Sequence, residues 1–177
     1  VDLDGVAVGD PLRTSLRPGP AAAATQVAAS LAAGVAPAVA DVEPPAWLLP
    51  EQRYPLRRAV AALRAFGGAM LASPVGTGKT YVALAGARSW QRSSVACMVP
   101  AALAAQWRAT AARLGVSIVI GTHERASRGG LPESTSGLVI VDESHHFLHP
   151  AIARYRRLAD FLVGRPALLL SATPVVN

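Results

Sequence analysis

From about residue 47 onward, the hydrophobic and polar positions of the chain follow two alternating patterns. Short, continuous apolar runs stand between longer segments in which apolar residues recur every three or four positions. Continuous runs are typical of strands buried on both faces of a sheet, and the spacing of three to four predicts amphipathic helices. The predicted strands are 68–73, 94–99, 116–122, 136–143 and 166–173, and the predicted helices are 54–66, 79–90, 100–114 and 151–163.

Regular alternation of these strands and helices predicts an α/β fold in which helices cover both faces of a parallel sheet. In such sheets ligands bind beyond the carboxyl ends of the strands. The polar motifs of this chain stand at those ends, so we expect the functional site there. The inward-facing positions of the first and last predicted helices are Leu56, Val60, Leu63 and Phe66, and Ile152, Tyr155, Leu158 and Leu162, respectively.

The N-terminal part of the chain has a different character. Residues 18–40 carry no charge and consist mainly of alanine, with proline and glycine among them. A membrane span of this composition would have a weak transfer free energy, and a secretory signal usually lies closer to the N-terminus and has a centre richer in leucine. We therefore expect residues 1–45 to be a linker or a loosely docked helix, and residues 46–177 to form the ordered domain.

The composition narrows the class of protein without deciding its function. A core of ordinary size is possible, because 51% of the residues are hydrophobic and 16% are charged. The net charge of +6 and the pI of about 10.7 permit an acidic partner such as nucleic acid. Cys97 is the only cysteine, which excludes a disulfide framework within the chain and favours a reducing compartment such as the cytoplasm.

The segment from Ser73 to Thr80, "SPVGTGKT", has the pattern of a phosphate-binding loop, since a predicted strand enters it and a predicted helix leaves it. Gly76 and Gly78 would let the backbone N–H groups point inward around an anion, and the helix N-terminus would add partial positive charge. Lys79, the only lysine of the chain, would bridge the β- and γ-phosphates, and the Thr80 hydroxyl would bind Mg²⁺. The pattern usually begins with glycine. Ser73 is a mild departure because that position mainly needs a small residue. The alternative interpretation is a structural glycine turn.

Two adjacent carboxylates, Asp142 and Glu143, follow the apolar run "LVIV". At a strand tip, Asp142 could hold Mg²⁺ through water, and Glu143 could orient and deprotonate an attacking water. Such a pair can also be a solvated turn, but the phosphate loop upstream favours the catalytic interpretation. A metal site built from Asp142, His145 and His149 is a further alternative. It is disfavoured because no cysteine lies nearby and Asp142 already has a role.

Three of these motifs, "SPVGTGKT", "DESH" and "SATP", resemble motifs I, II and III of superfamily-2 helicases and translocases, in the same order. Finer details are similar to the Swi/Snf-like branch of that superfamily. Pro100, Leu103, Gln106 and Trp107 match its "PxxLxxQW" motif, "GTHERASR" resembles its motif Ib region, and "SATPVVN" resembles its motif III. The DESH form differs from the DEAD and DEAH boxes, and "SAT" replaces the "TGT" of chromatin remodellers. Both departures point to a bacterial-type translocase relative and leave a helicase or a restriction-type subunit open. The resemblance runs from Trp47 to Asn177.

This resemblance implies a RecA-like P-loop lobe that binds ATP and Mg²⁺. Gln52 matches the Q-motif glutamine and would contact the adenine edge. Ser171, Thr173 and His145 would couple hydrolysis to nucleic-acid contact. The implied nucleotide-binding residues are Gln52, Ser73, Pro74, Val75, Gly76, Thr77, Gly78, Lys79 and Thr80.

The resemblance also implies a nucleic-acid partner, DNA in preference to RNA. Its contact residues would be Gln106, Thr122, His123, Arg125 and Arg128, which would grip the phosphate backbone without reading sequence. For each arginine, an ordinary solvated surface position is the alternative. Trp107, in contrast, shares a predicted helical face with Leu103, Ala111 and Leu114, so we expect it to pack in the core.

The motor of this superfamily has two RecA-like lobes with ATP between them, and the second lobe supplies an arginine finger. No second copy of the fold is found in this chain, so we expect the chain alone to bind nucleotide weakly and to hydrolyse it slowly. Two functions stay open: the first lobe of an ATP-driven nucleic-acid motor, or a non-motor module that binds a nucleotide or a partner. An AAA+ or other phosphate-loop ATPase is disfavoured by "SATP" directly after the fifth strand.

Overall fold

The structure, a computed structural model, describes residues 39–90, 95–132, 137–147 and 153–173. All of these residues belong to one compact unit, residues 37–177. The linker expected over residues 1–45 lies mostly outside the described residues and stays a prediction. Among the helices of the described residues, none is both long enough and apolar enough to cross a membrane.

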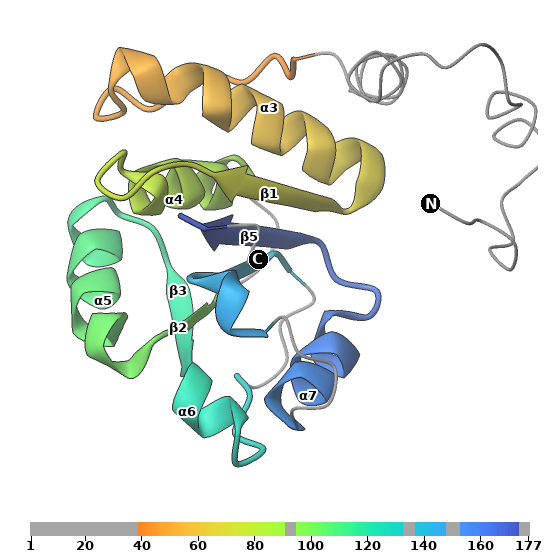
Figure 1. The fold of residues 1–177 in the computed structure, drawn as a ribbon. Coiled ribbons are helices and arrows are strands. Elements are labelled where there is room, and N and C mark those ends of the chain that lie inside the picture. Colours follow the sequence, from red (N-terminus) through yellow and green to blue (C-terminus); the bar gives the residue numbers. More distant parts are fainter. Residues whose placement is uncertain (1–38, 91–94, 133–136, 148–152, 174–177) are drawn as a thin grey trace, which may run out of the picture. The chain divides into compact units, whose positions relative to one another are not determined.

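Five parallel strands form the central sheet, in the order β1-β5-β4-β2-β3 (Figure 1). Parallel pairing and buried apolar strands are what the continuous hydrophobic runs predict, so the predicted fold class is confirmed. The order also sets the layout of the site, because β5 lies between β1 and β4. The strands are β1 (Gly68–Ala72), β2 (Val95–Val99), β3 (Ile118–Thr122), β4 (Val139–Val141) and β5 (Ala167–Ser171).

Each predicted helix is present, with ends that differ by a few residues. The helices are α3 (Pro50–Phe66), α4 (Lys79–Ser89), α5 (Ala104–Arg113) and α7 (Ala153–Leu162). The 3₁₀ turn η1 (Ala101–Leu103) falls within the predicted helix 100–114, and two short elements were not predicted: the helix α6 (His123–Ala126) and the 3₁₀ turn η2 (Ser144–Phe147). Each of them is four residues or fewer, which is too short to show a helical period in the sequence.

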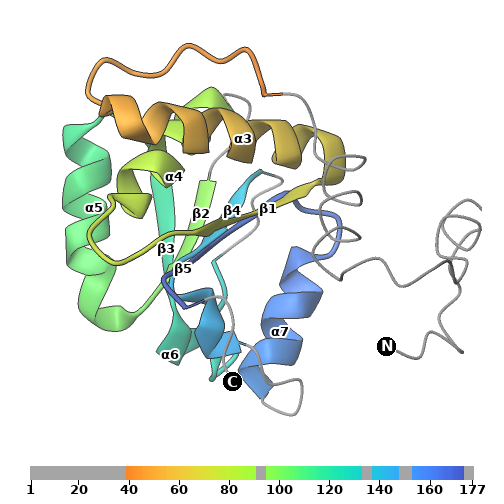
Figure 2. The same ribbon diagram turned by 45° about the horizontal axis from the view of Figure 1, so that its top comes forward.

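Alternate strand residues point to opposite faces of the sheet and pack into two separate cores. Cys97, Ile140 and Leu168 belong to the larger core under α3, α4 and α5. Their neighbours Met98 and Val141 belong to the smaller core under α6, η2 and α7. Figure 2 shows the helices on the two sides of the sheet. Coverage of both faces therefore follows the prediction.

The predicted inward-facing positions of two helices are mostly correct. Leu56, Val60 and Leu63 of α3 are buried, but Phe66 is 57% exposed, so its predicted burial is wrong. Phe66 is the last residue of α3, and the chain turns there through Gly67, at φ 70°, into the edge strand β1. In α7, Leu158 is buried, while Tyr155 and Leu162 are partly buried against the smaller core. Ile152 lies outside the described residues.

Candidate nucleotide-binding site

The phosphate loop leaves the end of β1 and enters α4 at Lys79. Gly76 and Gly78 both have positive φ, 84° and 77°, and Gly78 is the N-terminal cap of α4. Glycine adopts this left-handed conformation without the steric cost that an L side chain would add. A Cβ atom at Gly78 would also lie 2.2 Å from Gln52 Nε2. The backbone conformation therefore favours glycine at this position, and a larger residue would also displace the Gln52 amide.

The loop keeps hydrogen-bond donors available for an anion. Within the described residues, no backbone carbonyl accepts a hydrogen bond from the N–H of Gly76 or Gly78. Among those residues, the N–H groups of Lys79 and Thr80 also have no backbone partner, whereas the next two N–H groups donate to the Gly78 carbonyl, and the helix dipole places partial positive charge there. A helix N-terminus that follows such a loop suits a phosphate group.

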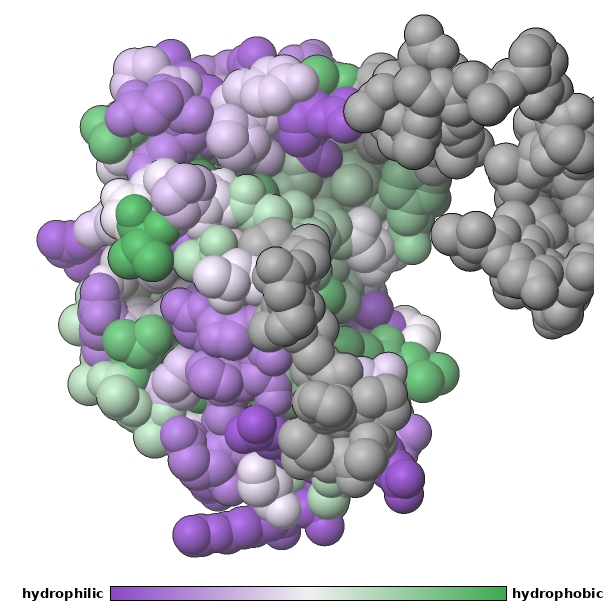
Figure 3. All heavy atoms as spheres, in the orientation of Figure 1, coloured by the Kyte–Doolittle hydropathy of each residue, from purple (hydrophilic) through white to green (hydrophobic). Residues whose placement is uncertain are grey.

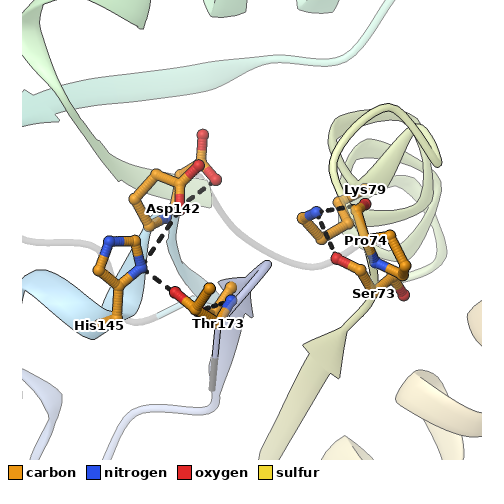
Figure 4. Close-up of polar contacts among 8 residues, drawn as sticks. Ser73, Pro74, Lys79, Asp142, His145 and Thr173 are labelled. Carbon is orange, nitrogen blue, oxygen red and sulfur yellow. Dashed lines mark hydrogen bonds and ion pairs between the residues drawn. The ribbon is translucent and has the colours of Figure 1, made fainter. Parts of the chain in front are cut away.

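Lys79 folds back onto the loop that precedes it. Its Nζ donates hydrogen bonds to the carbonyl oxygens of Ser73 (2.7 Å) and Pro74 (2.9 Å), which Figure 4 shows. The Thr77 hydroxyl also donates to the Pro74 carbonyl, at 2.9 Å. These contacts hold the ammonium at the loop, where exchanging carbonyl oxygens for phosphate oxygens would need only a small movement of a flexible side chain.

Gln52 fastens the start of α3 to the loop. Its Oε1 accepts from the Leu49 N–H (3.2 Å), and its Nε2 donates to the Thr77 carbonyl (3.1 Å), a contact between residues 25 apart in sequence. Its side chain is buried. The expected adenine contact of Gln52 would therefore use the second amide hydrogen or the second lone pair, since the first of each is engaged with the protein.

A cavity of about 420 Å³ lies between the start of α3 and the loop. Leu49, Pro55 and Val82 form part of its apolar lining, and Gln52 and Lys79 provide polar groups. The volume falls in the range of small-molecule sites, which is about 300 to 1,000 Å³, and such sites are mainly apolar with a few polar groups. This cavity can accommodate a nucleoside next to the phosphate loop.

Asp142 is buried at the tip of β4, and its two carboxylate oxygens have separate partners. Oδ1 accepts from the Glu143 N–H (3.0 Å), and Oδ2 accepts from the indole Nε1 of Trp107 (3.0 Å). Burial raises the pKa of Asp142, while these two hydrogen bonds and the Lys79 ammonium act in the opposite direction. Trp107 is 1% exposed and packs in the larger core, as predicted, but its bond to Asp142 was not foreseen.

Glu143 has an unusual backbone and an unsatisfied side chain. Its φ of 47° lies in the left-handed region, which costs an L-residue about 1 to 2 kcal/mol. Its Oε2 is buried without a hydrogen bond, although His145 Nδ1 lies 3.3 Å away. The distance allows an ion pair with a protonated His145, but the geometry does not satisfy the criteria of a hydrogen bond. Local strain and an unpaired buried oxygen are both typical of functional sites.

His145 links the tips of β4 and β5. Its Nδ1 lies 3.3 Å from the Ser171 hydroxyl, which also accepts from the Thr173 N–H at 3.1 Å. Figure 4 shows this chain of contacts beside Asp142. The three residues expected to couple the motifs therefore lie in one hydrogen-bonded group. His149, the other residue of the alternative metal site, lies outside the described residues.

The phosphate loop and the carboxylates meet at a second pocket of about 280 Å³. Lys79 and Thr80 line one side of it, and Asp142 and Glu143 line the other, with Gln106 of α5 beside them. Mg²⁺ in nucleotide sites uses one or two carboxylates together with phosphate oxygens and water. The hydroxyl and the carboxylates of this pocket fit that preference. Among the described residues, no group of three His, Cys, Asp or Glu side chains could form an all-protein metal site.

The residues expected to contact nucleic acid lie in different environments. Thr122 caps α6 by accepting from the Arg125 N–H (3.2 Å), and Arg125 and Arg128 are exposed there. Hydrophilic side chains gather over the α6 end of this unit in Figure 3. His123 is buried, with its ring edge-on to Phe147 at 4.7 Å, so a phosphate contact would require it to move. Gln106 lines the pocket between the phosphate loop and the acidic pair, and its expected contact with nucleic acid stays a prediction.

His123 is also perturbed electrostatically. Burial lowers its pKa to about 4, although nearby backbone carbonyls of Met98 and Asp142 favour the charged form. Its Nε2 is buried and has no hydrogen-bond partner within the described residues. A neutral ring in this place belongs to the packing between α6 and η2.

Comparison with known proteins found no related sequence but did find a similar structure. No protein-family model matches the sequence, and no curated protein is similar enough to count as a relative. The structure is similar to the SWI2/SNF2 ATPase core of Sulfolobus solfataricus, solved in complex with double-stranded DNA, with a TM-score of 0.58 and 16% sequence identity. The match covers 75% of this chain and 34% of that one. This chain therefore has the fold of a RecA-like ATPase lobe.

Proposed function

We propose that residues 46–177 are the ATP-binding lobe of an ATP-dependent nucleic-acid helicase or translocase of the Swi/Snf-like branch of superfamily 2. The observation that carries the proposal is the pocket in which Lys79 and Thr80 of the loop face Asp142 and Glu143 at the tip of β4. The loop offers donors to phosphate, and the strand tip offers carboxylates to a cation and to water. A structural glycine turn would not require the two acidic residues opposite it.

In this proposal each side chain has a defined role. Lys79 exchanges its bonds to the Ser73 and Pro74 carbonyls for bonds to phosphate oxygens. Thr80 and Asp142 would hold Mg²⁺, which when bound would neutralise charge on the phosphates. Glu143 accepts a proton from the attacking water, a role that suits a carboxylate oxygen without a hydrogen-bond donor.

In this proposal, the contacts among His145, Ser171 and Thr173 couple ATP hydrolysis to nucleic-acid contact. They join the tip of β4, where ATP would be hydrolysed, to the tip of β5. A change at Glu143 can reach Ser171 through His145, since His145 Nδ1 lies 3.3 Å from both. We also propose that a second RecA-like lobe, in the same chain or in another, completes the active site.

A nucleic-acid track, DNA in preference to RNA, is also proposed. Its support is the basic net charge, the exposed Arg125 of α6 and Arg128 of the turn that follows it, and the DNA present in the structural neighbour. Contacts of this type go to the phosphate backbone and depend on salt rather than on base sequence.

The test is MgATP hydrolysis by the natural-length protein, measured without polymer and then with duplex DNA, single-stranded DNA or RNA. A Lys79→Ala variant serves as the control. Stimulation by one polymer, lost in the variant, is the expected result and identifies the track. ATP binding without stimulation by any polymer would refute the motor and leave a nucleotide-binding module.

A further inference from the structure

Trp107 and Asp142 form a buried hydrogen bond that packing alone does not require. They lie 35 residues apart in sequence, on α5 and at the tip of β4, and their Nε1 and Oδ2 atoms are 3.0 Å apart. Trp107 is 1% exposed and Asp142 is 6% exposed. An indole N–H can only donate, and a hydrogen bond to a charged acceptor is roughly twice as strong as one between neutral groups.

Trp47 provides a comparison within the same chain. Its Nε1 is also buried, but it has no hydrogen-bond partner within the described residues. The described part of the fold therefore accommodates a partly buried tryptophan whose buried Nε1 has no partner there. At position 107, by contrast, the N–H is directed at one oxygen of the carboxylate that faces the phosphate loop.

The geometry around Asp142 explains what the bond can do. The Glu143 N–H binds Oδ1 and the Trp107 N–H binds Oδ2, so the plane of the carboxylate is held at both ends. Each carboxylate oxygen has a second acceptor direction that these bonds leave open. Because the Trp107 ring is packed in the larger core, its N–H cannot easily follow a rotation of the Asp142 side chain.

We propose that Trp107 is a positioning residue that holds the Asp142 carboxylate in the orientation needed to bind the Mg²⁺ of MgATP. The inference rests on the proposed function, because it assumes that Asp142 receives this cation. It adds a second role to the "QW" pair of α5, whose Gln106 lines the same pocket. Trp107 also borders that pocket, but it is 1% exposed and acts through Asp142.

The test compares Trp107→Phe, Trp47→Phe and the unchanged natural-length protein. Binding of a fluorescent ATP analogue is measured by titration in EDTA and at increasing Mg²⁺ concentrations. In EDTA, Trp107→Phe is expected to bind the analogue within twofold of the unchanged protein. The Mg²⁺ concentration at which half of the change in analogue binding has occurred is expected to rise about tenfold. A change of this size corresponds to the loss of one hydrogen bond to a charged group. Trp47→Phe is expected to change neither quantity.

The direction of the change in the Mg²⁺ requirement distinguishes a loss of carboxylate orientation from a change in carboxylate basicity. Losing a donor makes a carboxylate more basic, which by itself would strengthen Mg²⁺ binding. An unchanged or lowered Mg²⁺ requirement in Trp107→Phe would therefore overturn the proposal. So would an equal loss of affinity in EDTA and in Mg²⁺, since that indicates a general effect on the pocket. In an Asp142→Asn background, Trp107→Phe is expected to have no further effect on the Mg²⁺ requirement, and an undiminished effect there also overturns the proposal.

Failure of the proposed function and failure of Trp107→Phe to fold can both be told apart from failure of the role of Trp107. If the unchanged protein binds no ATP analogue, or binds it without any dependence on Mg²⁺, the proposed function fails rather than the role of Trp107. If Trp107→Phe does not fold, as judged by circular dichroism, benzothienylalanine at position 107 replaces it. That residue keeps the shape of the indole and lacks the N–H, so the same tenfold shift is expected, and its absence refutes the role.

Discussion

Replacing Gly78 by alanine is expected to destabilise the protein more than replacing Gly76, although the two glycines have similar conformations. Their φ angles are 77° and 84°, respectively. An alanine in this region costs about 1 to 2 kcal/mol, so strain contributes about equally at both positions. The space around them differs. Nothing lies within 4 Å of a Cβ atom at Gly76, whereas a Cβ atom at Gly78 would lie 2.2 Å from Gln52 Nε2.

The Gln52 side chain would have to move out of the way, and two hydrogen bonds hold it in place. Gln52 Oε1 accepts from the Leu49 N–H (3.2 Å), and Gln52 Nε2 donates to the Thr77 carbonyl (3.1 Å). Each such bond contributes about 1 kcal/mol to stability. We therefore expect Gly78→Ala to lower the free energy of unfolding by about 3 kcal/mol and Gly76→Ala to lower it by about 1 kcal/mol.

Urea unfolding followed by far-UV circular dichroism measures these differences. Gly78→Ala is also made in a Gln52→Ala background, where no side chain needs to be displaced. There its cost is expected to fall to about 1 kcal/mol, the strain alone. Equal costs for the two glycines in the unchanged background, or an undiminished cost of Gly78→Ala without Gln52, would refute the assignment of Gln52 as the group that packs against Gly78.

Three further predictions address catalysis, pH and the track. Glu143→Gln is expected to lower the hydrolysis rate of the natural-length protein by about 10²-fold or more while ATP binding persists. If the variant hydrolyses ATP as fast as the unchanged protein, Glu143 is not the general base. Because the pKa of His123 is about 4 in the folded chain and near 6.5 when unfolded, the unfolded state binds more protons as pH falls below 6.5. Stability should therefore drop by about 2 kcal/mol more between pH 7 and pH 5 than in His123→Phe, as measured by urea unfolding, and equal pH profiles would contradict a buried neutral ring. Replacing Arg125 and Arg128 by alanine should reduce the salt dependence of DNA binding, the slope of log K against log salt, by about 2, and an unchanged slope would place the track elsewhere.

Much of the architecture could be predicted because it follows from local patterns. A buried parallel strand needs a continuous apolar run, so β2 (Val95–Val99) and β5 (Ala167–Ser171) were visible without any partner strand. The phosphate loop could be recognised because its backbone needs glycine at positive φ, at Gly76 and Gly78. Asp142 and Glu143 could be placed at a strand tip because the apolar run ends directly before them.

Other features depended on which distant segments meet. Phe66 continues the apolar spacing of α3, yet it is exposed because the helix ends there at the edge of the sheet. His123 has the polar character of a surface contact, yet η2 covers it, and η2 is too short to leave a periodic pattern. Gln106 lines the pocket beside Asp142 because α5 approaches the tip of β4, a placement that its position in the sequence did not reveal.

By itself, the sequence determined the succession of strands and helices, the parallel sheet and the residue types of the phosphate loop and acidic pair. These depend on spacing along the chain and on backbone conformations that few residues adopt. The tertiary structure decided that Gln52 packs on Thr77 and Gly78, and that Trp107 holds Asp142 across 35 residues of sequence. Such contacts depend on the order of strands in the sheet and on the path of each helix across it. A hydrogen bond between distant side chains leaves no periodic trace in the sequence.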